Sequence, residues 1–258
     1  MTGELAAAGQ KSPGQRTLSL NELRFFLTRA AAGAGAPFGL GEDFAKAAIC
    51  LAALGIDPAP AAAAALAGLA DGNSGTRLTF AEADGVTILQ GEGRRPLSAL
   101  YAGPALADRL AVAAEDGGSC RMILKQADRP ALAAAAVAAA GIGAELAIAW
   151  PCGAGARAGI ASRCGRLEVL AGGGAVDRPG PADMEVLMEV GRNPAAAAAA
   201  AGPGGRRLAE LCGRIAEEGV TVAAAPWSAV YGHFAKCLVP SSPQSRAAGA
   251  GAGVGDND

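Results

Sequence analysis

Three side chains of this sequence have the types and surroundings from which nucleophilic or acid–base chemistry could be built: Cys152, His233 and Cys237. In "WSAVYGHFAKCL", His233 and Cys237 are four residues apart, which on a helix places them on one face, where a thiolate–imidazolium pair could form. Cys152, in "AIAWPCGAGAR", follows an apolar run and precedes glycines whose amides could approach an oxyanion. The alternative for all three is a packing role.

A glycine-rich segment, "SRAAGAGAGVGDND", ends the sequence within a predicted C-terminal loop, residues 241–258. Its glycines alternate strictly, and neither a helix nor a Walker-type lysine follows them, so the segment fails the dinucleotide and P-loop patterns. An arginine and two acids flank the glycines, and together they could offer a guanidinium and backbone amides to a carboxylate. The predicted ligand-binding residues are Ser245, Arg246, Gly249, Gly251, Gly253, Asp256 and Asp258. The alternative is a linker-like tail, which such a composition also describes.

Composition excludes several classes of function. The chain has 258 residues, a net charge of −2 and one histidine, which excludes multi-histidine zinc sites; no metal site is predicted and the cofactor stays unassigned. Basic residues cluster only in pairs, so nucleic acid is not an expected partner. No 18-residue apolar window suggests a membrane span. Six cysteines without a CxxC motif, and an N-terminus without an apolar signal core, predict reduced thiols in a cytoplasm.

The elements that must position these residues begin after a predicted disordered arm, residues 1–16, whose small polar residues cannot bury enough surface to order. Apolar residues at helical spacing then predict a helix from the Ser19 or Asn21 cap to Gly33–Gly35, and a second one closing at Gly55. A short third helix is expected after Pro60. Residues 17–72 are therefore predicted to be helical, with the first two helices forming a hairpin.

From Arg77 the period changes to two, and Asp84-Gly85 marks a β-hairpin. A similar hairpin signal, "RAGIASRCGRLEVLAGGG", starts at Arg157, and each hairpin is followed by "GPA", a strand-like run, an Ala/Leu-rich helix and an apolar run ending at tryptophan. This pattern predicts two hairpin-β-α-β repeats, residues 76–151 and 157–227; the alternative is that Ala-rich sequences align by chance. The predicted fold is α+β: one domain, residues 17–240, with the N-terminal helical hairpin packed on a mixed sheet.

Two resemblances add to these predictions. "LSLNELRFFLTRAAAGAGAPFGLGEDFAKAAICLAALGI" and "VPSSPQSRAAGAGAGVGDND" together resemble an uncharacterised bacterial family of unknown function, which implies an ordered C-terminal element and no particular activity. The N-terminal helical pair is also similar to the malate/lactate dehydrogenase family that differs from the Rossmann type. In that family the motif continues into a Ser-His-Gly with a catalytic histidine. Here "LGIDPAPAA", residues 54–62, stands in that place and contains no histidine.

Two functions are consistent with these features. The first is a cytosolic protein of small-molecule metabolism that binds or converts a small polar or anionic metabolite between the two repeats, with the C-terminal loop closing over it. The second is a non-catalytic subunit or scaffold whose helical hairpin docks a protein partner. The sequence leaves open whether the protein is an enzyme and whether it forms homo-oligomers.

Overall fold

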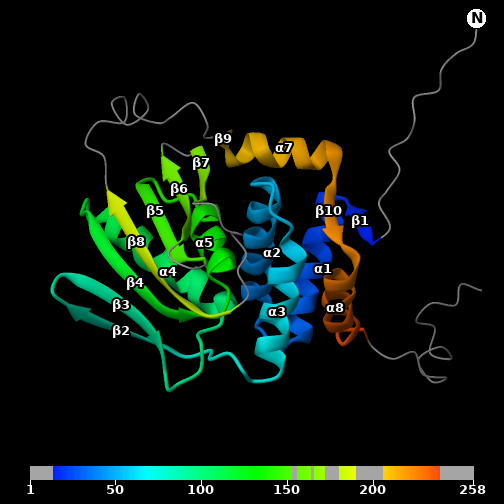
Figure 1. Cartoon of the computed structure of the whole chain (residues 1–258), viewed down its shortest axis with the longest axis horizontal. Helices are drawn as coiled ribbons and strands as arrows, with labels where there is room; N and C mark the ends of the chain where they lie inside the picture. The colour runs from blue at the N-terminus through cyan, green and yellow to red at the C-terminus, as the bar shows by residue number, and fades with distance from the viewer. Residues whose placement is uncertain (1–13, 153–155, 164–165, 172–179, 190–205, 239–258) are drawn as a thin grey trace, which may run out of the picture.

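The computed structural model describes residues 14–152, 156–163, 166–171, 180–189 and 206–238 (Figure 1). The helices of these ranges are α1 (Leu20–Gly33), α2 (Phe38–Ala53), α3 (Pro58–Ala70), α4 (Ala99–Glu115), α5 (Pro130–Ala139), α7 (Leu208–Glu218) and α8 (Ala224–Ala235). The strands are β1 (Gln15–Leu18), β2 (Leu78–Ala83), β3 (Val86–Gly91), β4 (Cys120–Ala127), β5 (Glu145–Pro151), β6 (Arg157–Arg163), β7 (Arg166–Ala171), β8 (Ala182–Glu189), β9 (Arg206–Arg207) and β10 (Val220–Ala223). The predicted α+β class and N-terminal helical hairpin are confirmed.

The helical hairpin begins at Ser19, one of the two predicted cap residues. Ser19 begins α1 with a capping box: the Glu22 amide donates to Ser19 Oγ over 3.2 Å, and the Ser19 amide donates to Glu22 Oε2 over 2.8 Å. α2 runs back along α1, and α3 starts earlier than expected, at Pro58, because the Asp57 side chain caps it. Gln15 and Arg16, expected in the N-terminal arm, belong to β1; residues 1–13 lie outside the described residues.

The main sheet has eight strands in the order β2-β3-β4-β8-β5-β6-β7-β9. β3 and β4 pair in parallel, and the other neighbours pair antiparallel. The Asp84-Gly85 hairpin is confirmed, with φ values of 52° and 73° at the two turn residues, as a type I′ turn requires. A second sheet consists of β1 and β10 alone.

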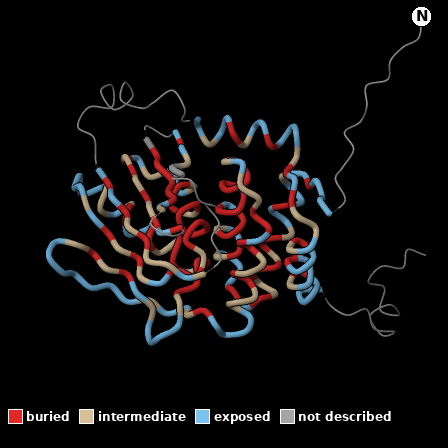
Figure 2. The backbone as a smooth tube through the Cα atoms, in the orientation of Figure 1, coloured by how far each residue is buried: buried red, intermediate tan, exposed pale blue. Residues whose placement is uncertain are grey.

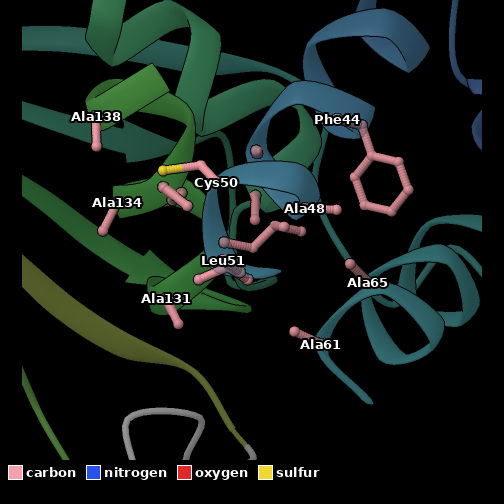
Figure 3. Packing of buried hydrophobic residues seen from close by; sticks show 14 of the residues in the cluster. Phe44, Ala48, Cys50, Leu51, Ala61, Ala65, Ala131, Ala134 and Ala138 are labelled. Atoms are coloured by element: carbon pink, nitrogen blue, oxygen red, sulfur yellow. The ribbon is translucent and has the colours of Figure 1, made fainter. Parts of the chain in front are cut away.

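The core lies between the main sheet and successive layers of helices. α4 and α5 contact the sheet, α2 packs between α5 and α1, and α8 packs on α1 and α3 at the far end (Figures 1 and 2). Figure 3 shows α2 with Cys50 on the side facing α5 and Phe44 on the side facing α3. Most buried residues of α2, α3 and α5 are alanines, which let the helices approach closely. Burial raises the pKa of the Cys50 thiol to about 12, so this cysteine is a packing residue.

The sequence prediction missed helix α4. "GPA", residues 103–105, was interpreted as a link between hairpin and strand, but it lies inside α4. Gly103 is needed there because a Cβ atom on it would lie 2.6 Å from the Ala136 Cβ of α5. The glycine therefore marks a close helix crossing, and Pro104 lies inside the helix, where its missing N–H removes one backbone hydrogen bond.

The two predicted repeats differ in arrangement within the described residues. β4, α5 and β5 form a crossover whose two strands flank β8 in the main sheet. The equivalent last strand of the second segment, β10, instead pairs with β1 in the second sheet. Trp227, expected at the end of that strand, lies on α8 because the chain turns helical at Ala224.

Candidate functional site

Two hollows lie beside helix α7. This helix crosses the C-terminal end of α2 and carries the chain from the edge of the main sheet to β10 (Figure 1). Its buried residues, Leu211 and Ile215, face inward, and Arg214 lies between them on the exposed side. A hollow of about 220 Å³ lies between α7, β10 and the loop after α2. A second hollow of about 380 Å³ lies between α7, β7, β9 and the end of α2.

Arg214 lines both hollows, and we call them together the Arg214 cleft. Arg206 adds a second guanidinium to the larger hollow. Within the part of the chain that the structure describes, the guanidinium group of neither arginine has a hydrogen-bond or ion-pair partner. Glu168 lies at the larger hollow and Glu218 at the smaller one. The cleft therefore combines free guanidinium donors with a mixed-charge rim and an apolar floor that includes Leu54 and Ile56.

Asp57 fixes the floor of the smaller hollow. Its Oδ1 accepts a hydrogen bond of 2.9 Å from the Ala59 amide at the start of α3, and its Oδ2 accepts one of 2.8 Å from the Ala223 amide at the start of α8. One carboxylate thus joins the N-termini of two helices, where negative charge is favoured. Both carboxylate oxygens of Asp57 are therefore engaged by backbone amides, which makes it a structural acid.

The predicted catalytic candidates do not come together. Cys237 lies beyond the end of α8, and its Sγ donates to the Arg29 carbonyl over 3.0 Å instead of pairing with the imidazole. His233 Nδ1 is buried without a hydrogen-bond partner among the described residues. Burial lowers the pKa of His233, the nearby Lys236 lowers it further, and Asp71 opposes both. This favours a neutral imidazole, and a thiolate–imidazolium pair stays a prediction without geometric support.

Cys152 is buried just after β5, and its amide donates to the Ala156 carbonyl over 3.0 Å. Gly153 and Gly155, the glycines after Cys152 that were predicted to approach an oxyanion, lie outside the described residues. The whole predicted ligand-binding set also lies outside them: Ser245, Arg246, Gly249, Gly251, Gly253, Asp256 and Asp258. In the described ranges no group of three or more histidine, cysteine or acidic residues is arranged to hold a metal ion.

Another polar cluster is buried between helices. Asp128, which follows β4, accepts hydrogen bonds from Ser74 Oγ over 2.6 Å and from the Ala99 amide over 2.8 Å. It therefore caps α4, whose own N-cap residue, Ser98, makes no side-chain cap and has a buried hydroxyl without a partner. Burial raises the pKa of Asp128 although these hydrogen bonds oppose the shift. The cluster is a structural joint, since both carboxylate oxygens bond to the protein.

Sequence reasoning missed the residues of the Arg214 cleft. In "LAELCGRIAEEG" the apolar spacing of Leu211 and Ile215 predicts which face of α7 is buried, and Arg214 falls outside that face. What the sequence lacks is a signal that α7 crosses the end of α2, about 160 residues earlier in the chain. No described helix is long and apolar enough to cross a bilayer.

Comparisons with known proteins agree with both resemblances at the level of family and fold. Residues 18–90 match the family "Protein of unknown function (DUF3726)", which confirms the similarity to an uncharacterised family over α1–α3 and the first hairpin. No curated protein matches the sequence.

Solved structures share the fold. Malate dehydrogenase from Pyrococcus horikoshii OT3 is similar with a TM-score of 0.64 at 10% identity, over 91% of this chain and 99% of that chain. Sulfolactate dehydrogenase from Methanocaldococcus jannaschii gives a TM-score of 0.59 at 8% identity, over 86% and 97% of the two chains. A dehydrogenase from Sinorhizobium meliloti gives 0.58 at 14% identity, over 85% and 99%. At these identities the likeness establishes the fold and not the activity.

Proposed function

We propose that the protein binds a small carboxylate-bearing metabolite in the Arg214 cleft. The observation that carries this proposal is the position of Arg214, a guanidinium that lines both hollows and has no partner among the described residues. A guanidinium binds a carboxylate through two parallel hydrogen bonds, which fixes the ligand's orientation as well as its charge. The names of the structural relatives, malate and sulfolactate dehydrogenase, also point to small organic anions.

The proposal concerns binding and names no hydride transfer. The segment Leu54–Asp57 lines the cleft, and both carboxylate oxygens of Asp57 are already hydrogen-bonded to backbone amides. The one histidine of the chain lies on α8 and faces Gly33 of α1 through its backbone. A proton carrier of the kind that the malate/lactate dehydrogenase resemblance implies is therefore missing from the matching segment.

Thermal unfolding with and without ligand tests the proposal. The probes are L-malate, D-lactate, 2-oxoglutarate and succinate, each with its fully amidated form as a neutral control. A binding ligand at 100 times its Kd raises the free energy of unfolding by about 2.7 kcal/mol, which is about 5–11 °C in Tm for a chain of this size.

Arg214→Ala should abolish the stabilisation by every acid that raises the Tm. Arg77→Ala is the matched control, because Arg77 is also exposed but lies outside the cleft and approaches only Glu92, at 3.8 Å. Equal stabilisation of both variants, or equal effects of acids and amides, would show that the cleft is not the site.

A further inference from the structure

A pocket separate from the Arg214 cleft opens where helices α2, α4 and α5 meet. Gly103 of α4 and Ala136 of α5 mark a close crossing of their two helices, since a Cβ atom on Gly103 would lie 2.6 Å from that of Ala136. Helices that cross at an angle separate on either side of the crossing. Just beyond it, a pocket of about 330 Å³ lies between residues 104–108 of α4 and residues 136–140 of α5, with α2 as its third wall. We call it the three-helix pocket, and its volume suits a small molecule.

Much of the wall of the three-helix pocket consists of short apolar side chains. They are Pro104 and Ala107 of α4, and Ala136, Ala139 and Ala140 of α5. Ala107 is buried, at 5% exposure, whereas Ala140, the residue that caps the C-terminal end of α5, is exposed. The pocket therefore extends from an open mouth beside Ala140 to an apolar floor beside Ala107. Side chains this short leave a space that the carbon chain of a ligand can fill.

Three charged side chains also line the three-helix pocket: Asp43 and Lys46 of α2, and Asp108 of α4. Asp43 and Lys46 form an ion pair with 2.9 Å between Oδ1 and Nζ, so their charges compensate each other. The exposed carboxylate of Asp108 has no hydrogen-bond or ion-pair partner among the residues that the structure describes. The pocket thus has one uncompensated negative charge, which a ligand with a single positive charge would balance.

We propose that the three-helix pocket binds a primary aliphatic amine in its ammonium form. The ammonium group pairs with the carboxylate of Asp108, and the carbon chain packs on the apolar wall. Because Asp108 is exposed and Ala107 is buried, the apolar end of the ligand enters first and the charge stays at the mouth. A lysine side chain of a partner protein would enter with its charge first and place an ammonium group on the apolar floor, which is unfavourable. The geometry therefore favours a free amine.

The three-helix pocket and the Arg214 cleft are independent sites. Among the described residues, none lines both of them. They also take ligands of opposite charge, since the cleft offers guanidinium groups and the pocket offers a carboxylate. The pocket therefore adds a second class of ligand to the carboxylates proposed for the cleft.

Titration of the full chain with n-hexylamine at neutral pH, followed by protein NMR, tests this proposal. Two probes keep the carbon chain and change the charge: 1-hexanol is neutral, and 2-aminoheptanoic acid adds a carboxylate beside the ammonium. Hexylamine should bind more tightly than both, because the alcohol has no charge to pair with Asp108 and the added carboxylate is repelled by it. Butylamine should bind more weakly than hexylamine, by up to about fourfold for each CH₂ removed from the apolar wall. Affinity for hexylamine should fall as salt concentration rises.

Two substitutions in the pocket should weaken the binding of hexylamine. Asp108→Asn removes the charge at the mouth and should raise the Kd about threefold to fivefold, the effect of one exposed ion pair. Ala140→Phe fills the mouth and should abolish detectable binding. The matched controls are Asp116→Asn, at the C-terminal end of α4 outside the pocket, and Ala235→Phe, at an exposed alanine that ends α8. Both controls should keep the wild-type Kd, and circular dichroism establishes that each variant is folded.

Four results would overturn the proposal. One is the absence of any binding of hexylamine, and another is equal binding of hexylamine and hexanol. A third is a Kd for hexylamine that Asp108→Asn and Ala140→Phe leave unchanged. The fourth is tighter binding of Nα-acetyl-lysine N-methylamide than of hexylamine, which would assign the pocket to a lysine side chain of a partner protein.

Failure of this site is distinguishable from failure of the metabolite site. Arg214→Ala should leave the Kd for hexylamine unchanged. Asp108→Asn should in turn keep the Tm increase caused by carboxylates.

Discussion

Two helix contacts in this protein are built from opposite kinds of side chain. Between α2 and α5 more than half of the buried residues are alanine, and Figure 3 shows alanines of α5 beside Cys50 of α2. Between α1 and α8 the contact consists of aromatic rings, two of which are nearly half exposed. Alanine side chains let the two helices approach closely, and the packed contact leaves no space for a larger side chain. Rings that extend past the contact leave apolar surface for another molecule.

The largest expected difference comes from the same substitution made on each side of this comparison. Phe44→Ala, in the closed core, should lower the free energy of unfolding by about 3–5 kcal/mol, because the surrounding alanines cannot fill the cavity. Phe25→Ala, in the contact of α1 with α8, should cost about 1 kcal/mol or less, since its ring is half solvated. Urea unfolding measures both; equal losses would mean that this ring belongs to the core.

A second pair of substitutions should give opposite signs. Gly103→Ala places a Cβ against Ala136 and should destabilise the protein by about 1–3 kcal/mol. Gly213→Ala, in the exposed α7 with nothing within 4 Å of the new atom, should stabilise it by up to about 1 kcal/mol through helix propensity. Thermal unfolding compares them. Stabilisation by both variants would contradict the close crossing of α4 and α5.

Two carboxylates in different surroundings should make the stability of the protein depend on pH in opposite directions. Burial raises the pKa of Asp128 above its ordinary 3.8, so its contribution to stability is full below that pH and is lost as pH rises through the folded value. The ion pairs with Arg157, at 3.0 Å, and Arg121, at 2.6 Å, lower the pKa of the half-buried Glu185 below 4.5, so its contribution is lost as pH falls.

The stability of the wild type relative to Asp128→Asn should therefore decrease from pH 4 upwards. Relative to Glu185→Gln it should decrease from pH 4 downwards. Urea unfolding across this range gives both curves, and parallel curves would contradict the assigned environments.

The smallest expected effect concerns the cation beside the exposed ring of Phe25. Arg29→Met keeps the apolar stem and removes the guanidinium over Phe25, which should cost about 0.5–1 kcal/mol. Lys46→Met is the comparison, because it removes an exposed charge that pairs with Asp43 on α2 over 2.9 Å and has no ring partner. A loss for Lys46→Met as large as that for Arg29→Met would place the effect in general charge and not in the ring contact.

Local signals predicted much of the fold. The start of α1 depends on Ser19 and Glu22, and the first hairpin turn depends on Asp84 and Gly85. In both cases the interacting residues lie within four positions of one another, so the sequence alone predicts the structure. Helix α4 was missed because the reason for Gly103 lies on another helix, at Ala136. The Arg214 cleft was missed for the same reason, since it forms where α7 crosses α2. The aromatic contact of α1 with α8 was not predicted because Phe26 and Tyr231 are 205 residues apart in sequence.

Asp57 has a consequence for how fast and how tightly a ligand binds beside it. Because its carboxylate ties the loop after α2 to the starts of α3 and α8, this wall of the Arg214 cleft is rigid before any ligand arrives. A ligand then loses little affinity to ordering of the loop. Association should therefore be a single fast step, without the slow phase that a loop closing over the ligand would add.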